Sequence, residues 1–191
     1  CSSDLIAAEL KERGAEVILV TGKTALTPPD GVQTVDVVTA EQMFRAATKA
    51  FDRCDAAVMC AAVADYTPQA VADTKIKKEG SAWNIALQPT RDIAAAIGAV
   101  KGTRLVAGFA LETDHERANA QSKLERKNMD FIVLNSLQDD GAGFGGNTNK
   151  ITILRRDGSE TVFGLKSKTE VAADIVDEIE AFWAPKNARP E

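Results

Sequence analysis

Histidine and long apolar runs are both scarce in this sequence, and each shortage excludes a class of protein. The single histidine among 191 residues is His115. A Ser-His-Asp or Cys-His nucleophile system would have to use it, and its polar surroundings at an expected helix start favour a solvated role instead. No apolar run reaches the ~18 residues that a membrane-spanning helix requires, so we expect no membrane association.

Cysteine and positive charge are also limited. The three cysteines, Cys1, Cys54 and Cys60, are odd in number and lack the spacing of a metal site. We interpret them as reduced thiols of a cytoplasmic protein, because the first ten residues lack the basic and apolar regions of a signal peptide. The net charge is −5. Nucleic acid is therefore not an expected partner, and any anion site must be built from local lysines.

What the sequence does contain is a regular alternation of strand-like and helix-like segments. This order is typical of a Rossmann-like three-layer α/β sandwich with a mostly parallel sheet. The expected helices cover residues 3–13, 39–53, 90–100, 114–128 and 167–183, and the expected strands cover residues 15–22, 33–38, 55–63, 83–89, 104–110 and 130–135. Residues 150–156 and 160–165, joined by Asp157-Gly158, are expected to form a C-terminal β-hairpin.

The length fits one domain with a continuous core. We expect residues 1–184 to form a single nucleotide-binding domain and residues 185–191 to be a frayed tail. A doubly wound domain ordinarily opens with a strand and a phosphate-binding turn, whereas this sequence opens at a helix. An N-terminal strand and turn are therefore expected to be missing from the chain as given.

Local signals place the helix starts. Thr39 and Gln42 have the spacing of a capping box, as do Thr113 with Glu116 and Ser167 with Glu170. Thr90 is expected to cap the helix that runs to about Val100. The segment 55–63 is almost wholly apolar, as expected for a strand in the middle of a parallel sheet.

Ligands of such sheets bind outside the carboxyl ends of the strands. The expected rim is therefore formed by "AAVADY" at 61–66 and by the residues that follow "GFA" and "VLN". The sequence "GAGFGG" at 141–146 matches Gly-x-Gly-x-x-Gly, but it is distant from the preceding strand and a strand-like segment follows it. A dinucleotide fingerprint needs a helix there, so a flexible loop near the rim is the better interpretation.

Two groups of lysines are candidates for anion binding. "KIKK" at 75–78 follows the rim segment in a loop long enough to fold back; an isolated lysine run is more often a solvated surface. Lys123 and Lys127 lie four residues apart on one face of a helix, where like charges repel by a few tenths of a kcal/mol. The spacing is compatible with an ordinary solvent-exposed helix. It is also compatible with an anionic ligand that offsets the repulsion.

Phe109 and Asp92 each allow two interpretations. Phe109 at the end of its strand is most often a core residue, and it could also stack on a base. Asp92 in the first turn of a helix interacts favourably with the helix dipole, and the same turn could contact a ligand.

Taken together, "AAVADYTP…KIKK", "PTRDIAAAIG", "GFALETD", "SKLERKNMDFIVLN" and "GAGFGGNTNKITI" closely resemble phosphopantothenate–cysteine ligase, the synthetase part of the bacterial bifunctional coenzyme A biosynthesis protein. The resemblance runs from Ser3 to about Glu180. It implies a CTP- and Mg²⁺-dependent reaction. The carboxylate of 4'-phosphopantothenate attacks the α-phosphate of CTP, and the amine of L-cysteine then displaces CMP from the acyl-cytidylate.

The resemblance also assigns residues. It implies that Lys75 is a catalytic flap lysine that contacts the nucleotide, while the Mg²⁺ ligands stay unknown. The other residues that it places at the nucleotide are Met59, Cys60, Ala61, Asp65, Arg91, Asp92, Ile93, Ala94, Phe109, Lys123 and Lys127. Relatives often have Asn-Pro-Asp-Ile where this sequence has Thr-Arg-Asp-Ile.

The resemblance further implies a homodimer whose arm is the segment around "ADYTP…KIKK…WNIAL", and no flavin in this chain. The family's catalytic Asn, in a segment before the first helix, is not supplied by residues 1–3. Two alternatives stay open: an NAD(P)-binding Rossmann protein and a non-catalytic nucleotide-binding module.

Overall fold

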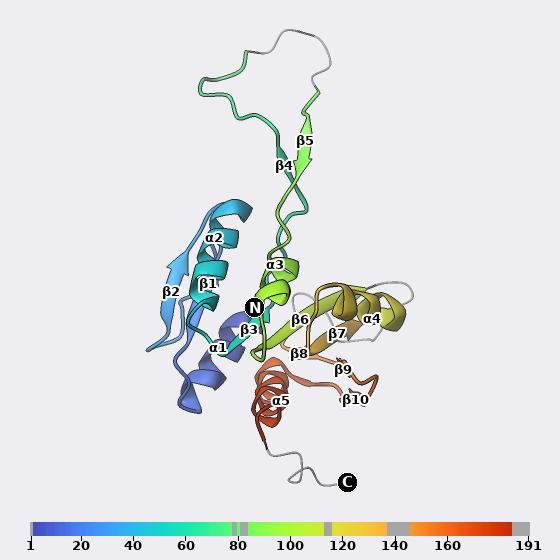
Figure 1. Ribbon diagram of the computed structural model, residues 1–191. Coiled ribbons are helices and arrows are strands. Elements are labelled where there is room, and N and C mark those ends of the chain that lie inside the picture. The colour runs from blue at the N-terminus through green and yellow to red at the C-terminus, as the bar shows by residue number, and fades with distance from the viewer. Residues whose placement is uncertain (1, 78–79, 81–83, 113–115, 137–145, 185–191) are drawn as a thin grey trace.

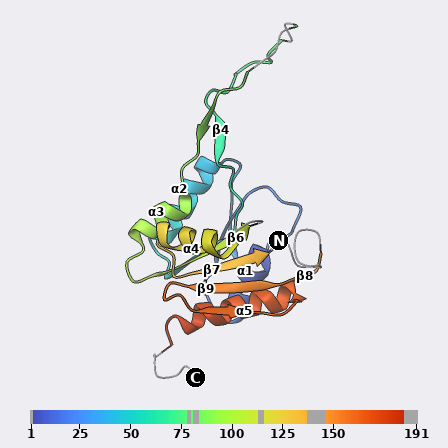
Figure 2. The same cartoon turned by 90° about the vertical axis from the view of Figure 1, so that its right-hand side faces the viewer.

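The protein folds as a five-stranded sheet between two layers of helices. The computed structural model describes residues 2–77, 80, 84–112, 116–136 and 146–184. One face of the sheet carries α2 (Ala40–Phe51), α3 (Ile93–Val100) and α4 (Glu116–Arg126), and the other carries α1 (Ser2–Glu12) and α5 (Lys168–Ala181) (Figures 1 and 2). The predicted three-layer α/β fold is confirmed.

The strands of this sheet lie in the order β10-β9-β7-β6-β3. Its members are β3 (Ala56–Met59), β6 (Leu105–Glu112), β7 (Phe131–Ser136), β9 (Ile151–Arg155) and β10 (Glu160–Val162). β3, β6 and β7 are parallel, whereas β9 and β10 form the predicted C-terminal hairpin and pair antiparallel. β6 and β7 are apolar on both faces because helices cover them on both sides, and Leu105, Val106, Ile132 and Val133 are fully buried.

The prediction for residues 55–63 is wrong in two respects. β3 ends at Met59, and in the described part of the chain it pairs only with β6, so it is an edge strand rather than a central one. β1 (Ile18–Thr21) and β2 (Gln33–Asp36) form a separate parallel pair. An apolar run indicates that helices cover both faces of a strand. It does not indicate whether the strand has a neighbouring strand along each of its two edges.

The resemblance implied an arm in the segment around residues 64–87, but the sequence did not predict that two paired strands build it. β4 (Tyr66–Pro68) was expected to be loop, and β5 (Leu87–Pro89) is shorter than the strand expected over residues 83–89. The two strands pair antiparallel and project from the body of the protein (Figures 1 and 2). The short antiparallel pair of β8 (Thr148–Asn149) and β11 (Lys166–Ser167) was not predicted either.

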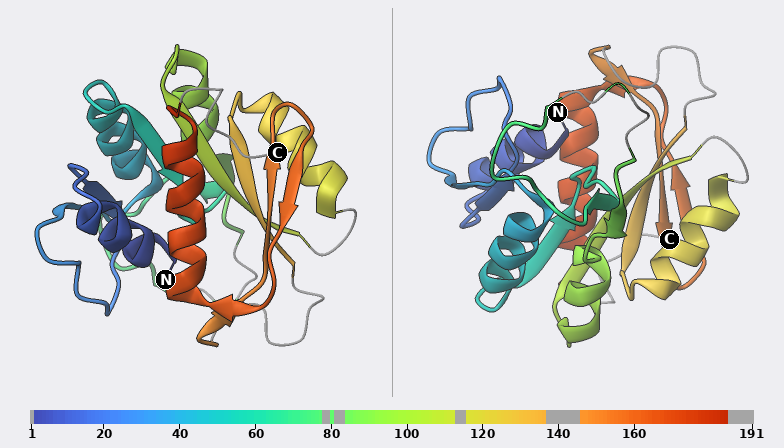
Figure 3. Two further views of the ribbon diagram at one scale, coloured as in Figure 1. Left: turned by 90° about the horizontal axis from the view of Figure 1, so that it is seen from below. Right: turned by 90° about the horizontal axis from the view of Figure 1, so that it is seen from above.

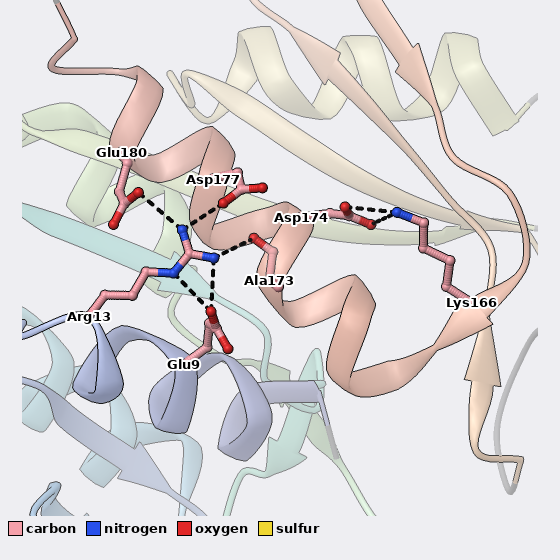
Figure 4. A network of polar contacts seen from close by, with 7 residues as sticks. All are labelled: Glu9, Arg13, Lys166, Ala173, Asp174, Asp177 and Glu180. Atoms are coloured by element: carbon pink, nitrogen blue, oxygen red, sulfur yellow. Dashed lines mark hydrogen bonds and ion pairs between the residues drawn. The ribbon is translucent and has the colours of Figure 1, made fainter.

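α1 and α5 lie side by side on their face of the sheet (Figure 3). Arg13 follows α1 and fastens the pair, because its guanidinium donates to Asp177 (2.6 Å), to Glu180 (3.0 Å) and to Glu9 (2.8 Å) (Figure 4). A planar guanidinium has enough donors to reach several carboxylates at once. The first and last helices are thereby joined.

Helix caps follow the sequence at two of the predicted positions. Thr39 and Ser167 both form complete capping boxes. The prediction that Thr90 caps a helix is wrong: α3 begins two residues later with Asp92 as its cap. The Thr90 hydroxyl donates instead to the carbonyl of Ala64 (2.7 Å), at the base of the arm.

Some expectations lie outside the described residues. These are the helix start at 113–115 with His115, the tail 185–191 and nearly all of the "GAGFGG" segment. Within the ranges that the structure does describe, no helix is both long enough and apolar enough to span a membrane.

Candidate nucleotide site

The base of the arm and the start of α3 are held together at the carboxyl edge of the parallel strands. The Thr90 N–H donates to the carbonyl of Asp65 (2.8 Å), and the Thr90 hydroxyl bonds the carbonyl of Ala64. The exposed Asp65 side chain therefore lies next to the turn that leads into α3. Residues from two distant parts of the predicted site are thus adjacent.

The start of α3 presents backbone rather than side chains. Ile93 and Ala94 are 5% and 9% exposed, so their side chains belong to the core. The first N–H groups of a helix lack partners within it and favour negative charge nearby. Asp92 accepts from the Ala95 N–H (3.0 Å). If Ile93 and Ala94 contact a nucleotide, they do so through their amides.

Lys123 of α4 and Lys127, which directly follows α4, reach the same edge. The Lys127 ammonium lies 3.1 Å from an Asp92 carboxylate oxygen, and its side chain is only 18% exposed. The Lys123 ammonium donates to the carbonyl of Phe109 (2.7 Å), just beyond the point where the pairing of β6 with β3 ends. The helical spacing of four residues thus places both cations beside strand β6 and the start of α3.

Asp92 is ionised more easily than an ordinary aspartate. Burial opposes its charged form, but the hydrogen bond from the Ala95 N–H and the contact with Lys127 outweigh this, so the pKa of Asp92 is lowered. The carboxylate therefore remains a partner for the Lys127 ammonium at neutral pH.

Arg91 makes contacts that the sequence did not reveal. Its guanidinium stacks on the ring of Phe44, 3.4 Å from the centroid, and lies 3.5 Å from a carboxylate oxygen of Glu41. Glu41 also accepts from Arg45 (2.7 Å). Arg91 therefore connects the start of α3 to α2.

Met59, Cys60 and Ala61 lie where β3 ends. Met59 packs against the core on the α2–α4 face, whereas Cys60 and Phe109 pack against the core on the α1–α5 face. Burial raises the pKa of Cys60 to about 12, so its thiol is protonated at neutral pH and is not a ready nucleophile. Phe109 is half-buried, which leaves part of its ring at the edge.

Lys75 is the predicted site residue that the structure does not bring to the others. It is exposed and belongs to the segment 69–77 beyond β4, in the projecting arm (Figure 1). Lys123 and Lys127 lie on the body of the protein. In a single chain the three lysines do not gather, so the role predicted for Lys75 depends on movement of the arm or on a second copy.

Sequence reasoning missed the partners that hold these side chains. The Lys127–Asp92 and Arg91–Glu41 contacts join residues far apart in the chain, and no local pattern announces them. Asn128 is the one feature near the site that a local pattern could have predicted. Asn just after the end of a helix is a known signal for a left-handed residue, and the φ of Asn128 is 52°.

No metal cage is present in the described ranges, since no group of three or more His, Cys, Asp or Glu side chains converges there. Mg²⁺ commonly binds through substrate phosphates with one or two carboxylates and several waters. The donor set fits that mode better than a site formed by the protein alone.

Together the fold and the site define a class: a Rossmann-like α/β domain with two lysines and a helix start at the carboxyl edge of its parallel strands. Its sequence identifies the family. The chain belongs to the DNA/pantothenate metabolism flavoprotein C-terminal domain family, whose model matches residues 4–182.

Several known proteins are similar to the chain. It is 38% identical over 169 residues to the coenzyme A biosynthesis bifunctional protein CoaBC of Bacillus subtilis (strain 168), covering 88% of this chain and 42% of that protein. It is 51% identical over 168 residues to a cysteine/cysteine sulfinic acid decarboxylase of an unknown prokaryotic organism, covering 87% and 47%. The crystal structure of the C-terminal domain of a CoaBC protein superimposes with a TM-score of 0.79 at 38% identity, covering 94% and 82%.

The chain spans about half the length, or slightly less, of the curated relatives that it matches. Their names therefore describe proteins with additional sequence.

Proposed function

We propose that the chain is the ligase domain that joins 4'-phosphopantothenate to L-cysteine at the expense of CTP, in coenzyme A biosynthesis. The observation that carries the proposal is the pair of lysines, Lys127 held at the start of α3 and Lys123 held at Phe109, in a member of a family whose relatives include CoaBC proteins. Both cations lie at the edge where α/β sheets bind ligands.

The reaction has two steps. A carboxylate oxygen of 4'-phosphopantothenate bonds to the α-phosphorus of CTP, and the bond to the bridging oxygen breaks, so that pyrophosphate leaves with the electron pair. The amine of L-cysteine then bonds to the acyl carbon and loses a proton, and CMP leaves. Both steps move negative charge between oxygens, so fixed cations and amide dipoles can supply much of the stabilisation.

The site residues suit this chemistry because their present partners are exchangeable. Lys127 is paired with a carboxylate and Lys123 with a carbonyl, and phosphate oxygens of a nucleotide would compete for both ammonium groups. The amides at the start of α3 would face the same anion. Arg91, next to them, would add charge only if it exchanged Glu41 for the ligand.

Magnesium belongs to this proposal as a companion of CTP. When bound to the phosphates it would neutralise charge and favour departure of pyrophosphate. Asp65 and Asp92 are the carboxylates at this edge that would accompany it, directly or through water.

The decisive experiment measures pyrophosphate release from CTP in the presence of 4'-phosphopantothenate, and CMP release on addition of L-cysteine. The assay uses this chain alongside a longer protein, extended at its N-terminus by the segment in which the resemblance places a required Asn. We expect CTP-dependent release by the longer protein. Binding of CTP without release by either protein would favour a non-catalytic module, and preferential binding of NADPH would favour the dinucleotide alternative.

The 51% identical relative supplies a second candidate, since its name is that of a decarboxylase acting on cysteine or cysteine sulfinic acid. The same preparations should be tested for CO₂ release from both compounds without CTP. Release by this chain at rates above those of the ligase assay would contradict the ligase proposal.

We also propose that residues 1–184 act as one domain, that two copies associate through the arm, and that the protein is cytoplasmic. The first is supported by the contact of α1 with α5, which joins the two ends of the described chain, and the second by the exposed apolar side chains on the arm. The third is supported by the relatives named for coenzyme A biosynthesis.

A further inference from the structure

α3 and the end of α4 approach each other so closely that only glycine fits at one position. A Cβ atom added to Gly98 would lie 1.9 Å from the carbonyl oxygen of Lys127, 3.0 Å from its carbonyl carbon and 3.4 Å from the Cβ of Asn128. The first distance is far inside van der Waals contact, and the obstacle is backbone, which cannot rotate away. Glycine inside a helix lowers stability by ~0.5–1 kcal/mol relative to alanine. The close packing that Gly98 permits must offset this loss.

Asn128 fixes this approach from the other side. It ends α4 with a left-handed φ of 52°. Its side-chain NH₂ donates to the carbonyl of Gly98 (2.7 Å), and its side-chain oxygen accepts from the guanidinium of Arg156. The amide is thus bonded at both ends, and the backbone directly after Lys127 is held against α3.

Lys127 consequently touches α3 at two places. Its carbonyl lies over Gly98, and its ammonium lies 3.1 Å from Asp92 at the cap of the same helix. The six residues from Asp92 to Gly98 span about 9 Å of helix, a distance that the long side chain covers because helix side chains point toward their own N-terminus. The closeness of residues 127 and 128 to α3 therefore sets the reach of the ammonium.

We infer that Gly98 and Asn128 are positioning residues that hold the Lys127 ammonium at the start of α3, where the anionic part of the nucleotide binds. Gly98 admits the carbonyl of Lys127, and Asn128 prevents the end of α4 from withdrawing. The consequence for ligand binding rests on the proposed function, whereas the geometry itself is independent of it.

The geometry is tested without ligand. The pKa of the Asp92 carboxyl is measured by NMR titration in wild type and in the variants Gly98→Ala, Asn128→Gly and Lys127→Ala. We expect the first two to raise the pKa of Asp92 toward its value in Lys127→Ala, because each displaces the ammonium. Asn128→Gly keeps a residue that tolerates positive φ and removes only the amide bonds, so it still decides the question if Gly98→Ala fails to fold.

Gly164→Ala is the matched control, because no heavy atom lies within 4 Å of its added Cβ. It should leave the pKa of Asp92 unchanged. A wild-type pKa of Asp92 in folded Asn128→Gly, and in Gly98→Ala where it folds, would overturn the inference.

The functional consequence is tested by calorimetric titration with CTP in a double-mutant cycle. We expect Lys127→Ala to raise the Kd for CTP roughly tenfold. Gly98→Ala should raise it about threefold, because the cation is displaced rather than removed. In the Lys127→Ala background, Gly98→Ala should add almost nothing, since both changes act through one contact.

The outcomes separate the two proposals. Additive effects of Gly98→Ala and Lys127→Ala on CTP binding would show a general structural role for Gly98 and overturn the inference. An unchanged Kd in Lys127→Ala would instead remove Lys127 from the proposed nucleotide site, and the NMR result would still decide whether Gly98 and Asn128 position its ammonium.

Discussion

At the scale of single residues, the site is defined by which partner each charged side chain holds. Lys123 and Lys127 look alike in sequence, yet one binds a backbone carbonyl and the other a carboxylate. The carboxylate is also a helix cap, so one side chain serves both the stability of α3 and the position of a cation. Substitution of Asp92 should change the stability of the protein, whereas substitution of Lys75 should change its turnover.

The stability of the protein should depend on the charge of Asp92. Its pKa is lowered in the folded state, so ionised Asp92 stabilises the fold above its unfolded value near ~4, and this stabilisation is lost as pH falls through the folded value. Asp92→Asn keeps a capping oxygen but no charge, and we expect it to lower the free energy of unfolding at pH 7 by about 0.5 kcal/mol. Urea unfolding at pH 7, 5 and 3 is the measurement.

The difference between wild type and Asp92→Asn should shrink toward zero at pH 3. Asp73→Asn, in the exposed segment of the arm, is the control and should match wild type at each pH. A difference between wild type and Asp92→Asn that grows as the pH falls would show that the sign of the pKa shift is wrong.

Lys75 should matter for turnover more than for binding, because it lies on the arm rather than at the α3 edge. We expect Lys75→Ala to lower kcat for product formation by roughly 10²-fold, the size found when one electrostatic stabiliser is removed, with a much smaller change in the Kd for CTP. Lys49→Ala, at an exposed lysine in the last turn of α2, is a suitable control. Equal rates for wild type and Lys75→Ala would remove the arm from the mechanism.

At the scale of elements, the arm exposes large apolar side chains that nothing in the single chain covers among the described residues. Tyr66, Val71, Ile76, Ile85 and Leu87 on the arm are all more than half exposed. Apolar side chains gathered on one projecting element are typical of an interface, and two strands alone are at best marginally stable in water. A second copy of the chain is the partner that we propose.

The double substitution of Ile85 and Leu87 by Glu should therefore convert a dimer into a monomer without unfolding the body. Burying charges without partners in an apolar interface is costly, and sedimentation equilibrium measures the shift in mass. Val162→Glu on β10 is matched in exposure, 55% against 56% for each arm residue, and should leave the dimer intact. A wild-type chain that stays monomeric at micromolar concentration would contradict the proposal.

At the scale of the whole molecule, the sheet is continuous from β10 to β3 and then stops. β1 and β2 form their own pair, so β1 and β3 each have one side without a strand partner among the described residues. α1 and α2 cover opposite faces of this region. We propose that a further parallel strand, in the segment that the resemblance places before α1, joins β1 to β3 in the longer protein that carries it.

Hydrogen exchange tests the proposed strand. In this chain the amides of β3 should exchange at least about tenfold faster than those of the central strand β6, because an edge opens locally more easily. In the longer protein, the amides of β1 and β3 should become protected while those of β6 change little. Protection of β1 and β3 that is the same in both proteins would contradict a joining strand.

The sequence alone determined much of the architecture and the place of the site. Apolar runs identified the central strands β6 and β7, capping boxes located α2 and α5, and the Asp157-Gly158 turn located the hairpin. The edge where we expect ligands to bind was inferred from the alternation of strands and helices. These features depend on contacts between near neighbours or on a periodic pattern, and both are written locally in the chain.

Only the tertiary structure decided which residues meet. It made β3 an edge strand and made Asp92, rather than Thr90, the cap of α3. It also paired β4 with β5 in the arm and placed the Lys127 ammonium on Asp92 through the close contact at Gly98. Each of these outcomes depends on groups distant in sequence competing for the same hydrogen-bond partner or the same space. Such competition is settled by packing in three dimensions, and a local pattern carries no record of it.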